Sequence, residues 1–522
     1  MSELATQGFI AECEREQLQR AQSIQPCGAL LGGRPGDARI RFASANLAHW
    51  LGEEAQAVLG RLLTSLLPDF PPPSEPGTEE GGDDAWLRPS SDKRFYPDLC
   101  IGPRGALDAL LSCSAETWLL EFEPALAPTE RHAAYRPVPH QLYRMPYSAE
   151  DWSRQCQFLV DTLRHITGFS RVMLYRFRDD DCGEVVAESL REGLDPYLGL
   201  RYPASDIPQI ARRLYLLNPH RQIPDIAAAP VPLLADPEGT LADLTLSELR
   251  AVSPVHLTYL RNMGVSASLS FSLVVSGRLW GLIACHHDQP AQLAPALRAR
   301  CAEMARAFTL AIYGYQSTRR LMDVSESDRE IAALVERLGS GGNIESVATA
   351  GEGSLAGQLL ALVGASGAAL IDGERCTTFG QTPPCAALLA LCRWLEASET
   401  PTVFATAALA EHYPPAREWR DRGSGLLAVR VERAGVSVSR TFLWWRPEQP
   451  QEVHWAGDPR KDALVRSGDG ELSPRASFAR WVEVTSGQAE PWGERELLRA
   501  KRFRGLILHA INADLLGALG AG

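Results

Sequence analysis

One segment of the chain has residue types that are well suited to bind a charged ligand, and it contains an aspartate between two prolines. In RYPASDIPQIARRLYLLNPHR, residues 201–221, Pro203 and Pro208 flank Asp206. Their rings restrict the backbone on both sides and remove two N–H donors, which directs the carboxylate and backbone carbonyl of Asp206 to one place. A predicted helix with further arginines follows and ends before Arg221, and the planar guanidinium suits carboxylate ligands. The same residues are equally typical of a helix start with a solvated charged face.

A second polar cluster follows in ELRAVSPVHLTYLRNMGVSASLS, residues 248–270. Pro254 begins a predicted helix on which His256 and Tyr259 share one face. Three serines then alternate along a predicted strand and share one of its faces: Ser266, Ser268 and Ser270. A single histidine on a helix is more often packed in a core. Convergence of this cluster with the arginines and with His286 would instead form an elongated pocket with carboxylate clamps and central polar groups.

These motifs carry a resemblance to a known family. PASDIP, SPVHLTYLRNMGV and LWGLIACHH resemble the chromophore-binding domain of phytochromes, and CEREQLQRAQSIQPCGALL resembles the N-terminus of bacterial phytochromes. SPRASF resembles the hairpin motif of the adjoining domain, and the five motifs stand in the family's order along nearly the whole chain. The resemblance implies an α+β photosensory core of tandem PAS, GAF and PHY domains joined by long helices. It also implies a figure-of-eight knot between PAS and GAF, and a hairpin "tongue" extending from PHY.

The resemblance further implies a linear tetrapyrrole cofactor and its point of attachment. Bacterial members attach biliverdin IXα through an N-terminal cysteine by a thioether, and Cys13 matches that position. Relatives that attach the pigment just before the pocket histidine have a cysteine where this chain has Val255, so biliverdin is the expected pigment. The chain departs from the family at IQPCG, where Cys27 replaces a histidine. We expect Cys27 to be packed, although competition for attachment is an alternative.

The roles of the remaining residues are implied by the same resemblance. Asp206 would offer its backbone carbonyl to the pyrrole nitrogens, His256 would hold a bridging water and a propionate, and Arg221 and Arg250 would pair with the propionates. Residues expected to contact the pigment elsewhere are Met173, Tyr175, Tyr202, Ile207, Pro208, Tyr215, Tyr259, Ser268, Ser270 and His286. His286 is preferred to His287 because neighbours on a strand point to opposite faces. Arg475, with Pro474 and Ser477 in the tongue, would reach Asp206 as a latch.

The helices and strands expected to position these residues are arranged in three domains. We assign residues 1–130 to PAS with the attachment arm, 131–318 to GAF and 319–505 to PHY, with the tongue at about 446–492; residues 506–522 form a helix that leads to an output module. GALLGG and ARIRFAS are typical of a hairpin, and SLSFSLVVSGRLWGLIACHH of another that turns at Ser276 and Gly277. A helical pattern without internal proline runs from Pro295 to the end of VERL, long enough to join domains or to dimerise.

The third predicted domain partly repeats the second. HITGFSRVMLY and LVGASGAALI each contain a helix end, a glycine, a serine and an apolar strand, so that Gly168 matches Gly364 and Ser170 matches Ser366. RTFLWWRPEQP and RLWGLIACHHDQP occupy corresponding places. Two related α/β domains in tandem are therefore predicted.

The amino-acid composition of the chain argues against several classes of binding partner. The 522 residues carry 52 basic and 64 acidic side chains, a net charge of −12 that argues against nonspecific nucleic-acid binding. No signal peptide opens the chain, and the longest apolar run, residues 355–371, is short for a bilayer and contains polar residues, so we expect a cytoplasmic protein without membrane contact. The eleven cysteines include no CxxC pair, which argues against a disulfide framework or a zinc site.

The predicted function is that of a red/far-red photoreceptor, not an enzyme, that photoisomerises covalently bound biliverdin and couples this to tongue refolding. A homodimer through the long helices is expected, with signalling to a histidine kinase output domain, which this sequence lacks, or to a separate response regulator. One alternative is a non-photochemical sensor of a cyclic nucleotide or haem built from the same domains. Another is a thiol-dependent enzyme using Cys13 with His256, which no recognisable orienting acid supports.

Overall fold

The computed structural model describes residues 17–68, 70, 87–237, 241–339, 354–398, 400–433, 436–457, 465–466, 472–473 and 478–520. These residues divide into two compact units. The first contains the chain up to Tyr315 together with residues from His454 to Trp481, and the second contains residues from Gln316 to Val453 and from Val482 onward. Both units combine sheets with helices, as the sequence predicts.

The N-terminal sheet of the first unit has the strand order β1-β11-β3-β2-β6-β5-β4. Strands β2 and β3 form the predicted hairpin, with Leu31 opposite Ala43. Along β6 the side chains alternate: Trp118, Leu120 and Phe122 enter one core, while Leu119 packs on the other face. The elements are η1 (Leu18–Arg20), β1 (Ser23–Ile24), β2 (Ala29–Gly33), β3 (Phe42–Ser44), α2 (Leu47–Leu51), α3 (Ala55–Val58), α4 (Leu63–Leu66), β4 (Ser90–Gly102), β5 (Gly105–Cys113) and β6 (Trp118–Pro124).

A loop from much later in the chain lies on both edges of β1. On one edge β11 (Val231–Ala235) pairs with β1 and continues into the sheet beside β3. On the other edge the Gln25 N–H donates to the Leu249 carbonyl at 2.7 Å, and the Ala251 N–H donates to the Ser23 carbonyl at 3.0 Å. A threaded N-terminal arm requires such an arrangement; the figure-of-eight knot itself stays a prediction.

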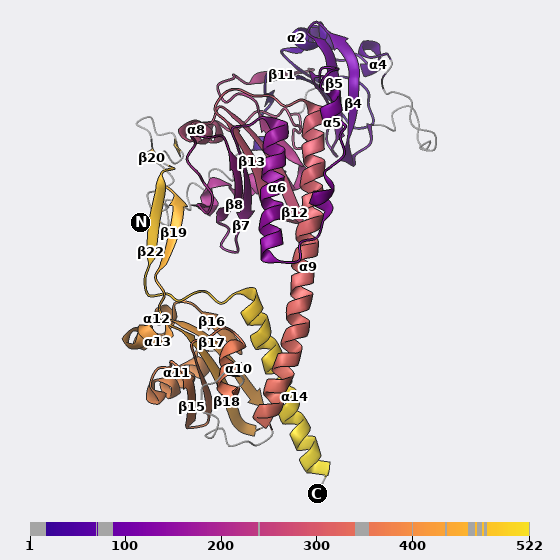
Figure 1. Cartoon of the computed structure of the whole chain (residues 1–522). Helices are drawn as coiled ribbons and strands as arrows, with labels where there is room; N and C mark the ends of the chain where they lie inside the picture. Colours follow the sequence, from indigo (N-terminus) through magenta and orange to yellow (C-terminus); the bar gives the residue numbers. More distant parts are fainter. Residues whose placement is uncertain are drawn as a thin grey trace. The chain divides into compact units, whose positions relative to one another are not determined.

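The second sheet of the first unit has the order β10-β12-β13-β7-β8-β9-β19-β22. Helices α6 and α9 cover one of its faces (Figure 1), where Leu159, Phe271 and Phe308 belong to one buried core. The predicted β12–β13 hairpin is confirmed and turns through Ser276 and Gly277, both at positive φ. The elements are α5 (Arg131–Ala134), η3 (His140–Tyr143), α6 (Ala149–Thr167), β7 (Arg171–Phe177), β8 (Gly183–Leu190), β9 (Arg201–Tyr202), η4 (Ala204–Asp206), α7 (Gln209–Leu217), β10 (His220–Ile223), α8 (Pro254–Asn262), β12 (Ala267–Val275), β13 (Arg278–His287) and α9 (Pro295–Gly339).

A hairpin arm from the C-terminal part of the chain joins this sheet. Trp455 of β19 pairs with Arg201 of β9, and the Gly457 N–H donates to the Ala479 carbonyl at 2.9 Å. The arm also places Phe478 against the ring of Tyr259, 5.0 Å between centroids. Its strands are β19 (Gln451–Ala456), β20 (Val465–Arg466), β21 (Leu472–Ser473) and β22 (Arg480–Thr485).

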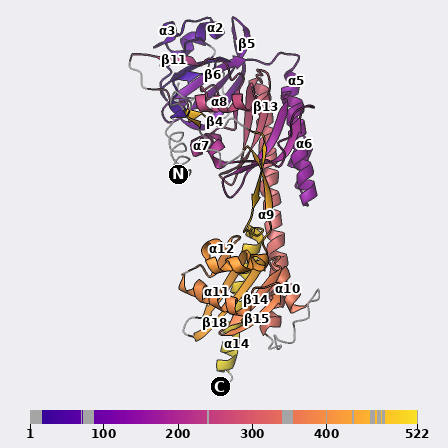
Figure 2. The ribbon, with the colours of Figure 1, turned by 90° about the vertical axis from the view of Figure 1, so that its left-hand side faces the viewer.

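The second unit is built around a sheet of order β15-β14-β18-β17-β16 with helices on both faces (Figure 2). Ala368 and Leu370 of β14 pack toward α10 and α14, whereas Ala369 and Ile371 pack toward α11 and α12. The elements are α10 (Leu355–Ala361), β14 (Gly367–Asp372), β15 (Arg375–Gly380), α11 (Cys385–Ala397), β16 (Val403–Thr406), α12 (Leu409–His412), η6 (Pro414–Trp419), α13 (Arg420–Gly423), β17 (Gly425–Arg433), β18 (Val436–Arg446) and α14 (Glu494–Gly520).

The predicted internal repeat is visible in both sheets. Gly168 and Gly364 adopt left-handed backbone angles, with φ of 71° and 60°, directly before the strand pairs β7–β13 and β14–β18. The long helix α9 also runs without interruption, as its pattern predicts. In the part of the chain that the structure describes, every helix is too short or too polar to traverse a lipid bilayer.

Candidate functional site

A cavity of about 240 Å³ lies in the first unit, on the face of the second sheet opposite α6 and α9. Helices α7 and α8 contribute to its walls together with β7, β10, β12 and β13. Every predicted binding residue that the structure describes lines it: Met173, Tyr175, Tyr202, Asp206, Ile207, Pro208, Tyr215, Arg221, Arg250, His256, Tyr259, Ser268, Ser270 and His286. Cys13 and the tongue residues Pro474, Arg475 and Ser477 lie outside the described residues.

The strand period explains how the sheet supplies polar groups to this cavity. Leu269, Phe271, Ile283 and Cys285 enter the core beneath α6 and α9. The residues between them, including Ser268, Ser270 and His286, therefore point to the opposite face, into the cavity. His287 lies on the other face, where its Nδ1 accepts from the Ser170 backbone N–H at 3.1 Å. The structure thus places His286, and not His287, at the cavity, as predicted.

Asp206 is held at the cavity wall by a hydrogen bond and by its backbone. The Tyr259 hydroxyl donates to its carboxylate at 2.9 Å. The two flanking prolines have ψ of 156° and 159°, so the backbone is extended on both sides of the short turn η4. This extension before and after the turn is the constraint expected from the PxxDxP spacing.

Arg212, for which the sequence predicted no role, holds this turn through hydrogen bonds. Its Nε donates to the Ile207 carbonyl at 2.8 Å, and its two terminal nitrogens donate to the carboxylate and carbonyl of Asp181, each at 2.8 Å. The guanidinium also lies over the ring of Phe177, 4.3 Å from the centroid. A buried arginine with these contacts positions the backbone of residues 206–208 at the cavity.

Among the described residues, two guanidinium groups at the cavity have no carboxylate partner, that of the buried Arg250 and that of the half-buried Arg221. Arg221 donates to the carbonyls of Glu248 at 2.9 Å, of Arg250, and of Ala251 at 3.3 Å. Arg250 donates to the carbonyls of Leu244 at 3.0 Å and Thr245 at 3.3 Å. Among the described residues, no carboxylate lies within 4.0 Å of either guanidinium. Burial, followed by the charge of Arg221, lowers the pKa of Arg250 to about 9, as expected for paired cations out of water.

The cavity is also lined by two neutral histidines. Burial, with a smaller contribution from Arg221, lowers the pKa of His256 to about 4, and burial followed by Arg171 and His256 lowers that of His286 to about 3. His286 Nδ1 is buried and has no hydrogen-bond partner among the described residues. Tyr215 and Ser270 share a hydrogen bond of 2.9 Å at the same wall. A bound ligand with polar groups would satisfy the imidazoles.

One side of the cavity is apolar and aromatic. Met173, Tyr175, Val185, Tyr202 and Leu282 form a buried cluster there. Tyr175 and Tyr202 have ring centroids 5.8 Å apart. A flat apolar ligand could pack against this surface while its polar arms reach the arginines.

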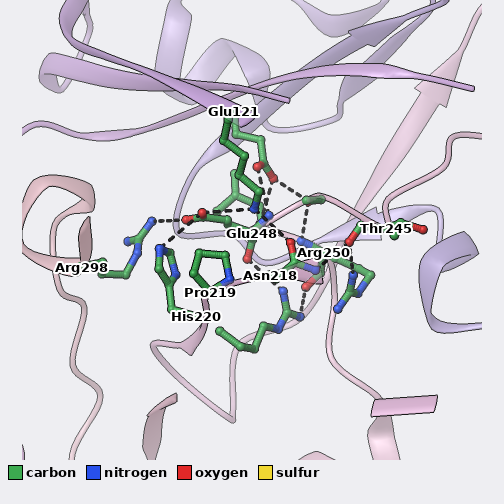
Figure 3. Close-up of polar contacts among 12 residues, drawn as sticks. Glu121, Asn218, Pro219, His220, Thr245, Glu248, Arg250 and Arg298 are labelled. Atoms are coloured by element: carbon green, nitrogen blue, oxygen red, sulfur yellow. Dashed lines mark hydrogen bonds and ion pairs between the residues drawn. The ribbon is translucent and has the colours of Figure 1, made fainter. Parts of the chain in front are cut away.

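The loop that carries Arg250 is anchored by a carboxylate from the N-terminal sheet, as Figure 3 shows. Glu121 of β6, only 2% exposed, accepts from the Ser247 hydroxyl and from the backbone N–H groups of Glu248 at 3.0 Å and Leu249 at 2.9 Å. The Ser247 hydroxyl in turn accepts from the Arg250 N–H at 2.8 Å. Burial, followed by the charge of Glu248, raises the pKa of Glu121.

A chain of ion pairs extends this anchor. Glu248 lies 3.3 Å from Lys93 and 3.1 Å from Arg298, and Arg298 also pairs with Glu123 at 2.5 Å. His220 Nε2 lies 3.4 Å from Glu248, and His220 lines the cavity although sequence reasoning did not select it. The alternation of Glu121 and Glu123 with apolar residues in WLLEFEPA is the signal that could have revealed this network, because a buried strand rarely carries two carboxylates without partners.

Cys27 is not among the residues that line the cavity of the predicted binding residues. It borders a separate hollow together with Pro26, Pro224 and Gln292. Burial, followed by the charge of Glu123, raises the pKa of Cys27 to about 12, so its thiol is protonated at neutral pH. The side chain is half-buried, and its part in pigment attachment stays a prediction.

The arrangement fits one chemical class of ligand. Paired guanidiniums without carboxylate partners suit an anion with two carboxylates, and Asp206 suits a cationic or proton-donating group. Neutral imidazoles and hydroxyls line the same cavity, and the aromatic wall suits a conjugated ring. An extended conjugated molecule with two carboxylate arms satisfies all of these groups, as an open-chain tetrapyrrole does.

Comparison with known protein families gives three matches in succession. Residues 13–73 match the family described as PAS fold, residues 151–312 match the GAF domain, and residues 332–515 match the phytochrome region. The order is that predicted from the motifs.

Curated proteins similar to this chain carry consistent names. The chain is 35% identical to the phytochrome-like protein Cph1 of a Synechocystis species, over 96% of this chain and 66% of that protein. It is 34% identical to the bacteriophytochrome of Pseudomonas aeruginosa over 95% of this chain and 66% of that protein. It is also 34% identical to the bacteriophytochrome of Xanthomonas campestris pv. campestris, over 95% of this chain and 78% of that protein. The chain spans about two thirds of the length of most of these relatives.

Solved structures agree with the predicted architecture. The crystal structure of bacteriophytochrome RpBphP3 from R. palustris superposes with a TM-score of 0.76 at 32% identity, covering 96% of this chain and 99% of that one. The phytochrome photosensory core module of Stigmatella aurantiaca gives the same TM-score and identity, with 96% and 98% coverage. Both are similar to this chain over nearly all of its length.

Proposed function

The chain belongs to the phytochrome family of photoreceptors, and on this premise we propose that it is a red/far-red photosensory core that binds biliverdin IXα covalently. The proposed signal is Z/E photoisomerisation of the bilin coupled to refolding of the tongue. The observation that carries the proposal is the pair of guanidiniums, of Arg221 and Arg250, that have no carboxylate partner among the described residues and share one cavity with Asp206 and two neutral histidines.

The residues present fit the proposed pigment group by group. Arg221 and Arg250 would hold its propionates, with His256, Ser268 and Ser270 completing their hydrogen bonds. His286, whose Nδ1 is buried without a described partner, would bond a terminal ring carbonyl. Met173, Tyr175, Tyr202 and Tyr215 would surround that ring, and Ile207, Pro208 and Tyr259 would line the pyrroles near Asp206. Bound there, the bilin supplies light absorption and a photoisomerisable double bond.

Charged groups of both signs line the cavity. The carboxylate and backbone carbonyl of Asp206 would favour a protonated ring system. The guanidiniums of Arg221 and Arg250 would hold the anionic arms. The low pKa values of His256 and His286 keep both imidazoles neutral at pH 7, so that neither adds a cation beside the protonated pigment.

We propose Cys13 as the attachment residue, by a thioether between its sulfur and a vinyl-derived carbon of the pigment. This assignment is supported by its position in the N-terminal motif. The variant Cys13→Ala should still bind pigment noncovalently but lose the pigment band on a denaturing gel. Retention of that band in the variant would show that another thiol forms the bond.

The domain limits and partners are proposals of the same kind. Residues 1–130, 131–318 and 319–505 are proposed as PAS, GAF and PHY, with the tongue at about 446–492 and an output helix at 506–522. Arg475 with Pro474 and Ser477 would latch the tongue to Asp206. We further propose a cytoplasmic homodimer that signals to a histidine kinase domain or a separate response regulator, without nucleic-acid or membrane partners.

The deciding experiment mixes the purified chain with biliverdin and illuminates it. Absorbance that shifts reversibly between red and far-red supports the proposal. Pigment binding without reversible photochemistry would favour a small-ligand sensor, for instance of a cyclic nucleotide or haem. A chain that stays colourless would overturn the proposed cofactor.

A further inference from the structure

Two thiols in the second unit lie together, outside the site already described. Cys376 lies on β15, the edge strand of the sheet, and Cys385 is the first residue of α11. The Cys385 Sγ is 3.9 Å from the carbonyl oxygen of Cys376. Cys385 is exposed and Cys376 is half-buried against the core beneath α11. The start of β15 and the start of α11 therefore bring two cysteines into contact.

The connection between the two elements keeps these thiols close. Strand β15 ends at Gly380, whose φ of 67° reverses the chain, and a Cβ at that position would lie 2.4 Å from the Ser366 carbonyl oxygen. Pro383 and Pro384 then restrict the backbone immediately before α11. With so few free torsions in the loop, the two thiols stay neighbours.

A third cysteine nearby provides a contrast. Cys392 lies on α11 two turns after Cys385 and is buried in the core. Burial, followed by the thiols of Cys385 and Cys392, raises the pKa of Cys376 to about 12. Of these three cysteines, Cys385 is the most exposed, Cys376 is half-buried and Cys392 is buried.

We propose that Cys376 and Cys385 form an oxidisable dithiol, which a hydroperoxide converts into a disulfide between β15 and α11. In the first step the Cys385 sulfur attacks the O–O bond of hydrogen peroxide, which gives a sulfenic acid and one water molecule. In the second step the Cys376 sulfur attacks the sulfenic sulfur, its proton leaves with the hydroxyl as a second water, and the S–S bond forms. Two thiols are thereby oxidised and one peroxide is reduced. A thiol reductant restores the pair by exchange.

This modification would act independently of the pigment. None of the residues that line the cavity of the first unit belongs to this cysteine pair. We therefore expect oxidation to leave the absorbance of a pigment-loaded sample unchanged, and to protect the loop before α11 from proteolysis.

The test uses the full chain without pigment, so that its outcome does not depend on the proposed photoreceptor function. The protein is treated with hydrogen peroxide, quenched with N-ethylmaleimide, digested and analysed by mass spectrometry. The expected result is a peptide linked through positions 376 and 385, lighter by two hydrogens, that disappears on reduction.

Three variants separate the possible outcomes, with circular dichroism confirming that each is folded. Cys376→Ser and Cys385→Ser should abolish the link, whereas Cys392→Ser should retain it. Overoxidation of Cys385 to a sulfinic acid without a link would overturn the proposal. A link from Cys376 to Cys392 instead of Cys385 would overturn it equally.

Discussion

The carboxylate of Asp206 and the backbone beside it are held by different residues. Tyr259 donates to the carboxylate, while Arg212 holds the carbonyl of the next residue, Ile207. Removing the negative charge should therefore leave the backbone turn in place. This separation makes the charge of Asp206 testable by itself.

The substitution Asp206→Asn should lower the pH at which the bound pigment holds its proton. A carboxylate near a cationic group favours the protonated form by about one to three pKa units, so its loss should move the deprotonation of the holoprotein down by a similar amount. Absorbance titration measures this shift. Tyr259→Phe, which keeps the charge and removes the hydroxyl that donates to Asp206 at 2.9 Å, should shift the titration less. Equal shifts in the two variants would contradict the charge argument.

The histidines of the cavity predict an acid-sensitive apoprotein. The folded pKa of His256 is about 4, below the ordinary 6.5, so between these values the unfolded chain binds a proton that the folded chain does not. Stability present at pH 7 is therefore lost as the pH falls through this window, by roughly 2 kcal/mol at pH 5. His256→Gln should show a smaller loss than the natural chain in urea titrations at pH 7 and pH 5. An identical loss in both proteins would refute this origin.

At the scale of the element, α7 bears two adjacent arginines with opposite surroundings. Arg212 is buried and donates to Ile207 and Asp181, whereas Arg213 is exposed. Arg212→Ala should cost about 2–3 kcal/mol of unfolding free energy, because buried carbonyls lose their donors. Arg213→Ala should change it by less than about 0.5 kcal/mol. Chemical denaturation of both variants measures the two changes in unfolding free energy. A change close to zero for Arg212→Ala would show that water replaces the guanidinium as the hydrogen-bond donor.

Local motifs explain why so much of the cavity was predictable from sequence. Asp206, Ile207 and Pro208 stand in one short motif, and the resemblance to the family implied His286 as the cavity histidine, while the strand period sent His287 to the other face. The positions of Gly168 and Gly364 likewise predicted the repeated domain, since a left-handed turn before a strand has a local signature.

Contacts between elements that are far apart in sequence could not be predicted from local motifs. Ser247 and Glu121 are 126 residues apart in sequence, and Arg212 and Asp181 are 31 apart. Which buried carboxylate meets which loop depends on how β6 and the residue 244–251 loop pack, and no local pattern records that. The sequence shows only that Glu121 and Glu123 occupy a buried strand and need partners.

At the scale of the whole molecule, α9 combines a buried face with exposed apolar residues. Leu310 and Tyr313 are 65% and 56% exposed, although the same helix packs Phe308 and Ile312 into the core. A second copy of the chain is the proposed occupant of this face, because parallel long helices bury such residues against each other.

Leu310→Glu should then shift the purified protein from dimer to monomer in light scattering coupled to gel filtration. Leu241→Glu changes a leucine that is 57% exposed on a loop and should leave the dimer intact, while dissociation by both variants, or by neither, would argue against α9 as the interface.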